Sequence, residues 1–228
     1  MSRKISKGFA FILTIGAEAT KMREEKSELR FNGKPDSLRS TERLALLEID
    51  HVIALSIEDL WLERVLDVGT GTGLFAEAFA AKGLKVVGID VDDAMLEAAR
   101  RLVPEAVFTQ ARAEAIPYGD GEFDLSFLGF LLHETDDPVQ VLMEARRVSR
   151  SRVVVLEWPF VLDGHKPPIE QRLSVDRMLD IARVAGIERV EHRRLSHSDL
   201  YRMAVEPVRV RSCGVSPSNS SVRNIRIV

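Results

Sequence analysis

Short apolar runs alternate with amphipathic segments through the middle of the chain. These runs predict strands at 65–68, 85–89, 107–110, 123–128 and 152–156. Apolar side chains recur at helical spacing in the intervening segments, which predicts helices at 74–81, 94–102 and 138–148. This alternation is typical of parallel βαβ units with right-handed crossovers, which bind ligands at the carboxyl ends of their strands.

The segments on either side follow a looser pattern. Residues 40–56 and 174–185 are predicted helices, and each begins with a serine that is typical of a helix N-cap. We expect the first of these helices to cover the site, although a plain packing helix is the alternative. Residues 187–195 are predicted to form a strand, with 200–205 antiparallel beside it.

The two ends of the chain lack this periodicity. Basic residues precede an apolar run at 9–15, an arrangement that resembles a short signal peptide. The interpretation we favour is an extension of little consequence, with Met22 as a possible start of translation. We therefore expect a flexible extension over 1–36, one domain over 37–206 and a poorly ordered tail over 207–228.

A predicted strand runs through three alternating glycines, Gly69, Gly71 and Gly73, into a predicted helix. Glycine permits positive φ and lets a ligand approach the backbone closely. The start of the helix leaves free N–H groups, which favour a carboxylate. The spacing also satisfies the dinucleotide pattern of NAD enzymes, and an ordinary tight turn would show it too.

Two acids and a third segment narrow the choice of ligand. Asp67 stands two residues before the first glycine, where it would face a ligand's ammonium group and repel a pyrophosphate. Asp90 ends the next predicted strand, at the spacing where a carboxylate accepts hydrogen bonds from ribose hydroxyls. Because NAD proteins share that acid, Asp90 indicates a ligand that contains adenosine but does not distinguish NAD from other such cofactors. Residues 113–118 and 120–124 then lead into the fourth strand.

Taken together, residues 65–76, 88–90, 113–117 and 123–124 resemble the successive motifs of class I S-adenosylmethionine-dependent methyltransferases. The similarity is greatest to the small-molecule, methyltransferase type 11-like branch, and it covers about residues 64–157. It implies a Rossmann-like three-layer α/β sandwich, with a mostly parallel seven-stranded sheet whose last strand is antiparallel. It further implies S-adenosylmethionine as the cofactor and in-line methyl transfer to a small or medium-sized acceptor.

The resemblance also implies the cofactor contacts. Asp67 and the backbone of the glycine loop would hold the methionine end, and Asp90 would hold the ribose hydroxyls. The full implied set is Asp67, Gly69, Thr70, Gly71, Thr72, Gly73, Asp90, Val91, Met95, Arg112, Ala113, Glu114, Leu128 and Gly129. There are two departures. Arg112 stands where the family often has an acid, and residues 149–152 replace the usual turn before the fifth strand, which we expect to alter a loop away from the cofactor.

Candidates for acceptor binding lie at the ends of the later strands. His133 follows the fourth strand and is a candidate general base, although a structural or helix-capping role is the interpretation we favour. Glu157 and Trp158 end the fifth strand, where they would orient and wall an acceptor, or form a rim ion pair and a packed aromatic. Tyr201 is either a substrate contact or a core residue.

Composition excludes several classes of function. The chain has 228 residues, of which 45% are hydrophobic, enough for one α/β core. A net charge of −3 gives no support for nucleic-acid binding. Cys213 is the one cysteine, and no Cys/His cluster has zinc spacing, so we expect no metal. No apolar run approaches the roughly 20 residues of a membrane span. We therefore expect a cytoplasmic protein with a small-molecule partner, while its oligomeric state stays unknown.

Two other functions remain open at this point. An NAD-dependent oxidoreductase would share the glycine loop, but Asp67 and residues 113–117 argue against it, and no Tyr-x-x-x-Lys pair is present. A non-catalytic S-adenosylmethionine-binding regulator would show the same cofactor motifs as an enzyme.

Overall fold

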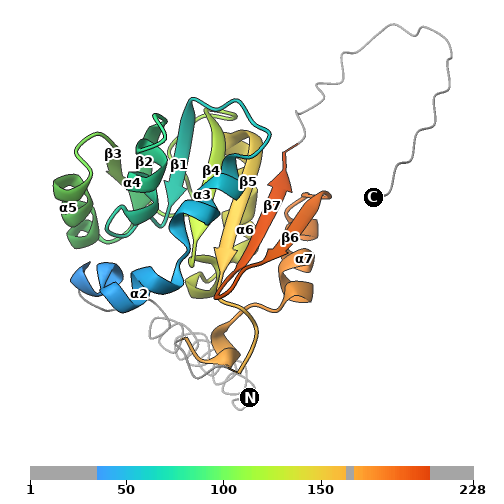
Figure 1. Ribbon diagram of the computed structural model, residues 1–228. Coiled ribbons are helices and arrows are strands. Elements are labelled where there is room, and N and C mark those ends of the chain that lie inside the picture. Colours follow the sequence, from blue (N-terminus) through green and yellow to red (C-terminus); the bar gives the residue numbers. More distant parts are fainter. Residues whose placement is uncertain (1–34, 163–166, 206–228) are drawn as a thin grey trace, which may run out of the picture.

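The computed structural model describes residues 35–162 and 167–205, which form a sheet with helices on both faces (Figure 1). The strands are β1 (Arg64–Val68), β2 (Lys85–Asp90), β3 (Val107–Gln110), β4 (Phe123–Gly129), β5 (Ser149–Glu157), β6 (Val190–Arg194) and β7 (Asp199–Ala204). They form a seven-stranded sheet in the order β3-β2-β1-β4-β5-β7-β6. Strand β7 runs antiparallel to both of its neighbours, and the other pairings are parallel. The predicted fold class is confirmed.

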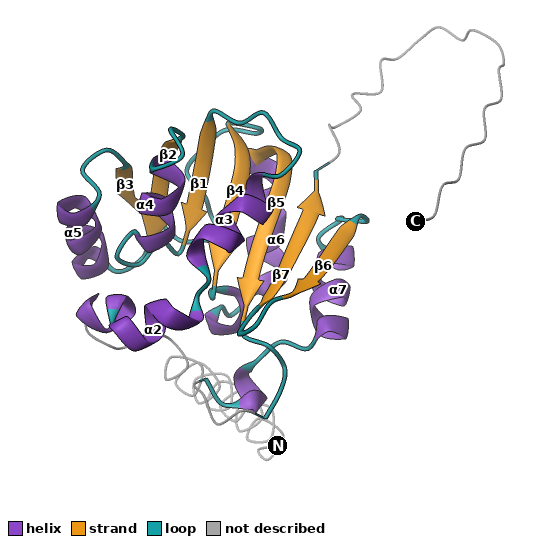
Figure 2. Ribbon diagram, viewed as in Figure 1, coloured by secondary structure: helices purple, strands orange, loops and turns teal. Residues whose placement is uncertain are grey.

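The helices divide between the two faces of the sheet (Figure 2). They are α2 (Thr41–Leu46), α3 (Ile49–Ile57), α4 (Leu74–Ala80), α5 (Asp93–Leu102), α6 (Pro138–Val148) and α7 (Val175–Val184), with short 3₁₀ turns η1 (Pro35–Arg39), η2 (Leu132–Glu134) and η3 (Ile169–Gln171). Apolar side chains of α3, α4 and α5 pack in one core layer, and those of α6 and α7 pack in the other.

Strand β5 shows how one strand serves both layers. Val154 and Leu156 join the layer beneath α3 and α4, whereas Val153 and Val155 join the layer beneath α6 and α7. All four are fully buried. Alternate side chains of a strand point to opposite faces, so a strand covered on both sides reads as one continuous apolar run. This is why the central strands could be predicted from the sequence.

Short polar side chains fix the start of several helices, as their positions predicted. Ser40 caps α2 by accepting from the Arg43 N–H, and Ser174 caps α7 by accepting from the Arg177 N–H. Pro138 lies in the first turn of α6. At the other end of α7, Gly186 takes a φ of +77°, which ends the helix.

The continuous helix predicted for 40–56 is wrong, because the chain breaks between α2 and α3. Leu47 turns into the core, where 1% of it is exposed. Glu48 adopts a left-handed φ of 44°. Its carboxylate accepts hydrogen bonds from the Ser196 backbone N–H at 2.9 Å and the Ser196 hydroxyl at 3.1 Å. These contacts to the chain before β7 are invisible in local sequence.

Other boundaries also shift. Residues 149–152, expected to lie in a loop, begin β5 instead, since Ser149 pairs with Phe123 of β4. The strand expected over 187–195 is shorter, because Ile187 is buried in the core beyond the end of α7. The predictions for residues 1–34 and 207–228 lie outside the described residues. Within the part of the chain that the structure describes, no helix is long and apolar enough to cross a membrane.

Candidate active site

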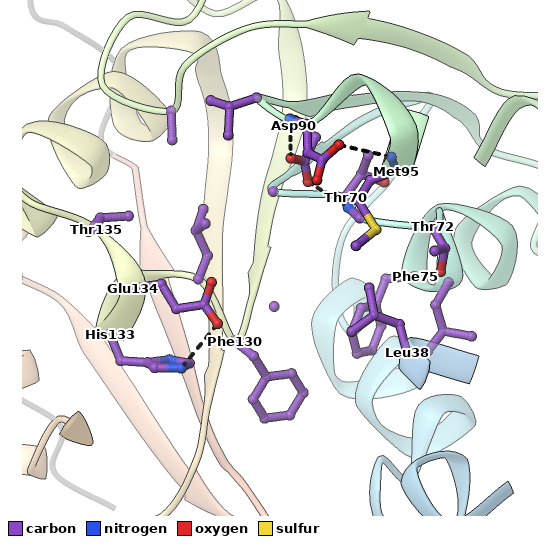
Figure 3. Close-up of a pocket in the computed structure, with 18 of the residues that line it drawn as sticks. Leu38, Thr70, Thr72, Phe75, Asp90, Met95, Phe130, His133, Glu134 and Thr135 are labelled. Atoms are coloured by element: carbon purple, nitrogen blue, oxygen red, sulfur yellow. Dashed lines mark hydrogen bonds and ion pairs between the residues drawn. The ribbon is translucent and has the colours of Figure 1, made fainter. Parts of the chain in front are cut away.

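A cavity of about 720 Å³ lies at the carboxyl ends of β1, β2 and β4. This volume is in the range of small-molecule and cofactor sites. Figure 3 shows Asp90, Met95 and Thr72 on one side of the cavity, His133 and Glu134 on the other, and Phe130 between them. The strand ends therefore bring together residues that are far apart in the sequence.

The glycine loop forms one wall of this cavity. Gly69, Gly71 and Gly73 take φ values of 69°, 52° and 76°, a region that favours glycine. A Cβ on Gly71 would lie 3.0 Å from the Leu38 side chain, in the space between the loop and η1. The loop is tied to β2, because the N–H groups of Gly69 and Thr70 both donate to the Ile89 carbonyl, at 2.8 and 2.9 Å.

Asp67 lies beneath the loop and does not line the cavity. It is 1% exposed, and its Oδ2 accepts a hydrogen bond from the Thr70 hydroxyl at 2.6 Å. Burial raises the pKa of Asp67 to about 7, although hydrogen bonds from Thr70 and the Ala76 backbone oppose the shift. In this structure Asp67 supports the loop from below, a different position from the ligand-facing one that the sequence suggested.

Asp90 does line the cavity, and it also shapes the loop. Its Oδ2 accepts from the Gly71 N–H at 2.8 Å, and its Oδ1 accepts from the Asp92 N–H at 3.0 Å. Burial raises the pKa of Asp90, and these backbone hydrogen bonds act against the rise. Val91 and Met95 line the cavity beside it. A carboxylate with further lone pairs here can accept from hydroxyl groups.

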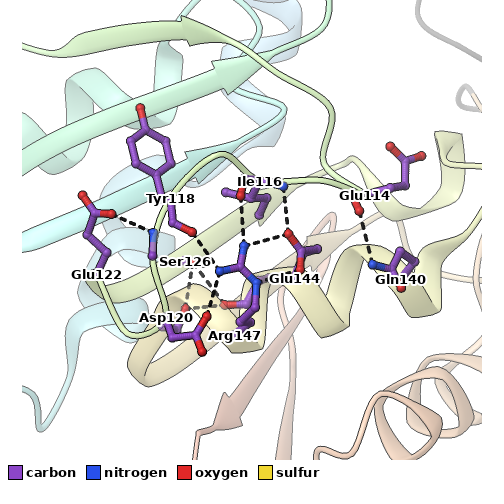
Figure 4. Close-up of polar contacts among 12 residues, drawn as sticks. Glu114, Ile116, Tyr118, Asp120, Glu122, Ser126, Gln140, Glu144 and Arg147 are labelled. Carbon is purple, nitrogen blue, oxygen red and sulfur yellow. Dashed lines mark hydrogen bonds and ion pairs between the residues drawn. The ribbon is translucent and has the colours of Figure 1, made fainter.

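Residues 112–118 form the rim beyond Asp90 and are held by α6 (Figure 4). The Arg147 guanidinium donates to the carbonyls of Tyr118 at 2.8 Å and Ile116 at 2.9 Å. Glu144 accepts from the Ile116 N–H at 2.9 Å and pairs with Arg147. The hydrogen bond to Glu144 and, to a smaller extent, the one to Asp120 raise the pKa of Arg147, while burial opposes the rise. Ala113 and Glu114, both of which line the cavity, lie in a turn closed by a hydrogen bond of 3.2 Å from the Ala115 N–H to the Arg112 carbonyl, and the side-chain amide of Gln140 in α6 donates to the Glu114 carbonyl at 3.3 Å.

His133 and Glu157 form a buried pair on the opposite side. The His133 Nδ1 lies 2.7 Å from Oε2 of Glu157, and the side chains are 4% and 1% exposed. Because a carboxylate only accepts, Nδ1 carries the proton of the neutral imidazole, and Nε2 is the nitrogen that gains a proton when the ring becomes charged. Nε2 lies 3.6 Å from Oε1 of Glu134. Burial alone would lower the pKa of His133, but the charge and hydrogen bond of Glu157, together with Glu134, raise it.

An aromatic wall completes the cavity next to this pair. The rings of Phe130 and Trp158 have centroids 4.3 Å apart, and the Phe75 ring lies 6.4 Å from Phe130. Phe130 has a φ of 55°, and its N–H donates to the Leu156 carbonyl at 2.7 Å. A bulky residue in this conformation is strained, and such strain concentrates at functional sites.

Most of the predicted site residues meet at the cavity. Those that line it are Gly69, Thr70, Gly71, Thr72, Asp90, Val91, Met95, Arg112, Ala113, Glu114, Gly129, His133 and Trp158. Five do not line it: Asp67, Gly73, Leu128, Glu157 and Tyr201. Gly73 begins α4, where a Cβ would meet the Phe108 ring at 3.1 Å. Leu128 is wholly buried in the core layer beneath α6. Its neighbour Gly129, the last residue of β4, lines the cavity instead.

Tyr201 is a correction to the substrate-side prediction. It is 1% exposed in β7, in the core layer beneath α6 and α7, and its ring stacks on His192 with centroids 4.9 Å apart. Glu157 lies behind His133 and reaches the cavity only through that imidazole. Arg112 is more than half exposed and pairs with Glu114 at 3.3 Å.

Several lining residues had no signal of their own in the sequence. They are Leu38, Arg43, Leu47, Leu74, Phe75, Ile89, Asp92, Ala111, Phe130, Leu131, Glu134, Thr135, Pro167, Pro168 and Gln171. Arg43 and Leu47 belong to the segment 40–56 that was predicted to cover the site, and Leu38 lies just before it in η1. This covering segment is fastened at its start by Arg39 of η1, which donates to the Thr72 carbonyl at 2.9 Å and pairs with Glu77 at 2.6 Å.

Comparison with known proteins identifies a methyltransferase domain within the chain. Residues 66–156 match the family described as "Methyltransferase domain". This match supports the predicted resemblance of residues 64–157 to class I S-adenosylmethionine-dependent methyltransferases. The chain is 35% identical over 124 residues to a demethylmenaquinone methyltransferase of Renibacterium salmoninarum, covering 54% of this chain and 50% of the relative. It is 31% identical over 133 residues to a malonyl-[acyl-carrier protein] O-methyltransferase of Hamiltonella defensa, covering 58% and 52%.

Solved structures share the methyltransferase fold. A SAM-dependent methyltransferase from Aquifex aeolicus superposes with a TM-score of 0.67 at 24% identity, covering 77% of this chain and all of that one. A [4+2]-cyclase, SpnF, superposes with a TM-score of 0.54 at 26% identity, covering 64% and 58%. The family match and these neighbours support S-adenosylmethionine as the cofactor, as predicted. The chain spans about half the length of the curated relatives it matches.

Proposed function

We propose that this protein transfers the methyl group of S-adenosylmethionine to a small-molecule acceptor held in the other half of the same cavity. One observation carries the proposal. The cavity runs without a break from the wall formed by the glycine loop, Asp90 and Met95 to the wall formed by Phe130 and His133. A single space with a cofactor side and an aromatic, polar side suits a reaction between two bound molecules.

The residues on the cofactor side fit S-adenosylmethionine. Gly71 leaves open the space that a side chain would fill, and Asp90 offers carboxylate oxygens to ribose hydroxyls. Met95 and Val91 offer apolar surface to a purine, and the fixed backbone at Ala113 offers polar groups to its edge. When bound, the cofactor supplies an electrophilic methyl carbon on a sulfonium sulfur.

The chain's own contribution is to position the acceptor and manage its proton. Holding two reactants in line is worth roughly 7–11 kcal/mol of the barrier. The acceptor half is walled by Phe130 and Trp158, which exclude water. In the neutral imidazole of His133, Nε2 is the nitrogen that accepts a proton, with Oε1 of Glu134 3.6 Å away, and Glu157 fixes the orientation of the ring. We assign to this imidazole the removal of a proton from the acceptor.

The relatives suggest acceptors to try first, since their names point to a demethylmenaquinone and to a malonyl thioester on a carrier protein. The comparisons give no support to an NAD-dependent oxidoreductase or to a non-catalytic regulator. The [4+2]-cyclase among the neighbours shows that the fold alone does not fix the reaction.

The deciding experiment measures turnover. The full chain is incubated with S-adenosylmethionine bearing a deuterated methyl group and with acceptor pools that include reduced naphthoquinones and malonyl thioesters. We expect stoichiometric formation of S-adenosylhomocysteine and of a product that carries the label. Tight cofactor binding with no labelled product from any pool would favour a regulator or a different reaction.

A further inference from the structure

Arg43 of α2 reaches the acceptor half of the cavity and lies over its aromatic wall. Its guanidinium carbon is 5.7 Å from the centroid of the Phe130 ring and 5.5 Å from that of Trp158. Contacts of this kind hold the flat face of a guanidinium against the rings and leave its N–H edge available. The edge is the part that binds planar oxyanions in a bidentate manner.

Arg43 is partly buried and, unlike Arg39, has no ion-pair partner among the described residues. Among residues 35–162 and 167–205, its guanidinium has aromatic contacts but no carboxylate within ion-pair distance. Arg39, one turn earlier, is by contrast paired with Glu77 at 2.6 Å. Burial lowers the pKa of Arg43, and the more distant charge of Glu134 acts against that shift. A cation that is partly withdrawn from water and faces a cavity is stabilised by an anion.

The platform beneath Arg43 is rigid. The positive φ of Phe130 is held by the hydrogen bond from its N–H to Leu156 in β5. Trp158 is 8% exposed and packs on Phe130. Arg43 itself follows the Ser40 cap, which accepts from its backbone N–H at 3.3 Å. The position of the guanidinium is therefore set before an acceptor arrives.

We propose that Arg43 binds an oxyanion of the methyl acceptor, a carboxylate or a phenolate attached to a planar group, and so selects the class of acceptor. This inference rests on the function proposed above. The other ionisable groups at this wall are His133 and Glu134, with Glu157 behind them. An acidic hydroxyl of the acceptor that gave its proton to His133 would become the anion that Arg43 holds. This anion would lie between two cations, the Arg43 guanidinium and the His133 imidazolium.

The test uses four small probes that share a benzene ring and differ in charge. Benzoate and 4-nitrophenolate are the two anions, benzamide is the neutral match, and benzylamine is the cation. Each is titrated by calorimetry into the full chain saturated with S-adenosylhomocysteine, at alkaline pH. Arg43→Met keeps the length of the side chain without its charge, and Arg43→Lys keeps the charge. Arg101→Met on the exposed face of α5 is the matched control.

We expect at least one anion to bind more tightly than benzamide and benzylamine, and the preferred anion tells whether the carboxylate or the phenolate is the natural group. Arg43→Met is expected to weaken that anion about 10- to 100-fold, the effect of losing a charged hydrogen bond. Arg43→Lys is expected to retain part of the affinity, and Arg101→Met all of it. S-Adenosylhomocysteine should bind every variant equally.

Three results would overturn the inference: no anion binds, benzamide or benzylamine binds as well as the anions, or Arg43→Met binds anions as the unmodified chain does. If Arg43→Met does not fold, Arg43→Lys and the comparison of the anions with benzamide and benzylamine still test whether Arg43 binds an oxyanion. A chain that fails to bind S-adenosylhomocysteine at all would instead count against the proposed function, so the two failures can be told apart.

Discussion

The Nδ1 of His133 lies 2.7 Å from Oε2 of Glu157, and the Glu157 carboxylate also accepts from the His133 backbone N–H at 3.2 Å. The pair fixes the tautomer of an imidazole that lines the cavity. Sequence alone favoured a structural role for His133, and a buried imidazole held by a carboxylate fits that role as well as the role of general base proposed above. The distinction is measurable, because a base titrates with the reaction.

His133→Ala should lower turnover by about 10²- to 10⁴-fold with nearly unchanged affinity for S-adenosylmethionine. In the unmodified chain the rate should fall as pH drops through the raised pKa of His133, since only neutral imidazole accepts a proton. Glu157→Gln removes the charge that raises this pKa, so the midpoint of its pH profile should move to lower pH. Equal pH profiles for both proteins would argue for a purely structural pair.

The raised pKa of Asp67 predicts that the free energy of unfolding depends on pH, independently of any effect of pH on activity. Its pKa of about 7 is above the ordinary value, so between about pH 4 and 7 the folded chain holds a proton that the unfolded chain has lost. The contribution of Asp67 to the free energy of unfolding is therefore complete below the pKa that Asp67 has in the unfolded chain, and it is lost as pH rises through the pKa that it has in the folded chain.

Asp67→Asn keeps an oxygen for the Thr70 hydroxyl and removes the titration. Urea unfolding should show that the unmodified chain loses more stability than the variant between about pH 5 and pH 8. Because His133 also has a raised pKa and loses its contribution as pH rises, the comparison must be made as a difference between the two proteins. A difference that does not vary with pH would mean that Asp67 is ionised throughout.

Arg39 is expected to hold the covering segment closed over the cofactor. Arg39→Ala removes its hydrogen bonds to Thr72 and its ion pair with Glu77, and should weaken S-adenosylhomocysteine binding about 2- to 10-fold. Glu77→Gln leaves both contacts to Thr72 and should cost less. Calorimetry on both variants checks the order, and an unchanged affinity for Arg39→Ala would show that the segment does not act on the site.

Substitutions in the glycine loop and at Asp90 should weaken cofactor binding to different degrees. Gly71→Val adds a branched side chain at a φ of 52°, in space bordered by Leu38, and should abolish cofactor binding. Asp90→Ala removes hydrogen bonds that are worth roughly 1.5–3 kcal/mol and should weaken binding without unfolding the chain. Circular dichroism serves as the control for folding. Near-normal binding by folded Gly71→Val would reduce the loop to an ordinary turn.

The sequence predicted those parts of the molecule that depend on local pattern. Strand β3 was expected at 107–110 and is found there, at the edge of the sheet, with Phe108 buried and Val107 exposed. Gly71 and Asp90 were paired by spacing, and the structure joins them through a hydrogen bond of 2.8 Å. Ser174 was expected to cap α7 and does so.

The parts that the sequence missed depend on contacts between distant segments. The break at Glu48 is held by Ser196, far along the chain, and no local pattern records that. Arg43 reaches the cavity only because the break turns α2 across the strand ends toward Trp158. For Tyr201 the sequence left both a substrate contact and a core position open, and its register beside Val155 places it in the core.

Calorimetric titration of S-adenosylmethionine and of NAD into the full chain shows whether the cavity is a site for S-adenosylmethionine. We expect saturable binding of one S-adenosylmethionine per chain, weakened in Asp90→Ala, and no measurable binding of NAD. Binding of NAD in preference, or of neither ligand by a folded chain, would rule out this assignment of the cavity.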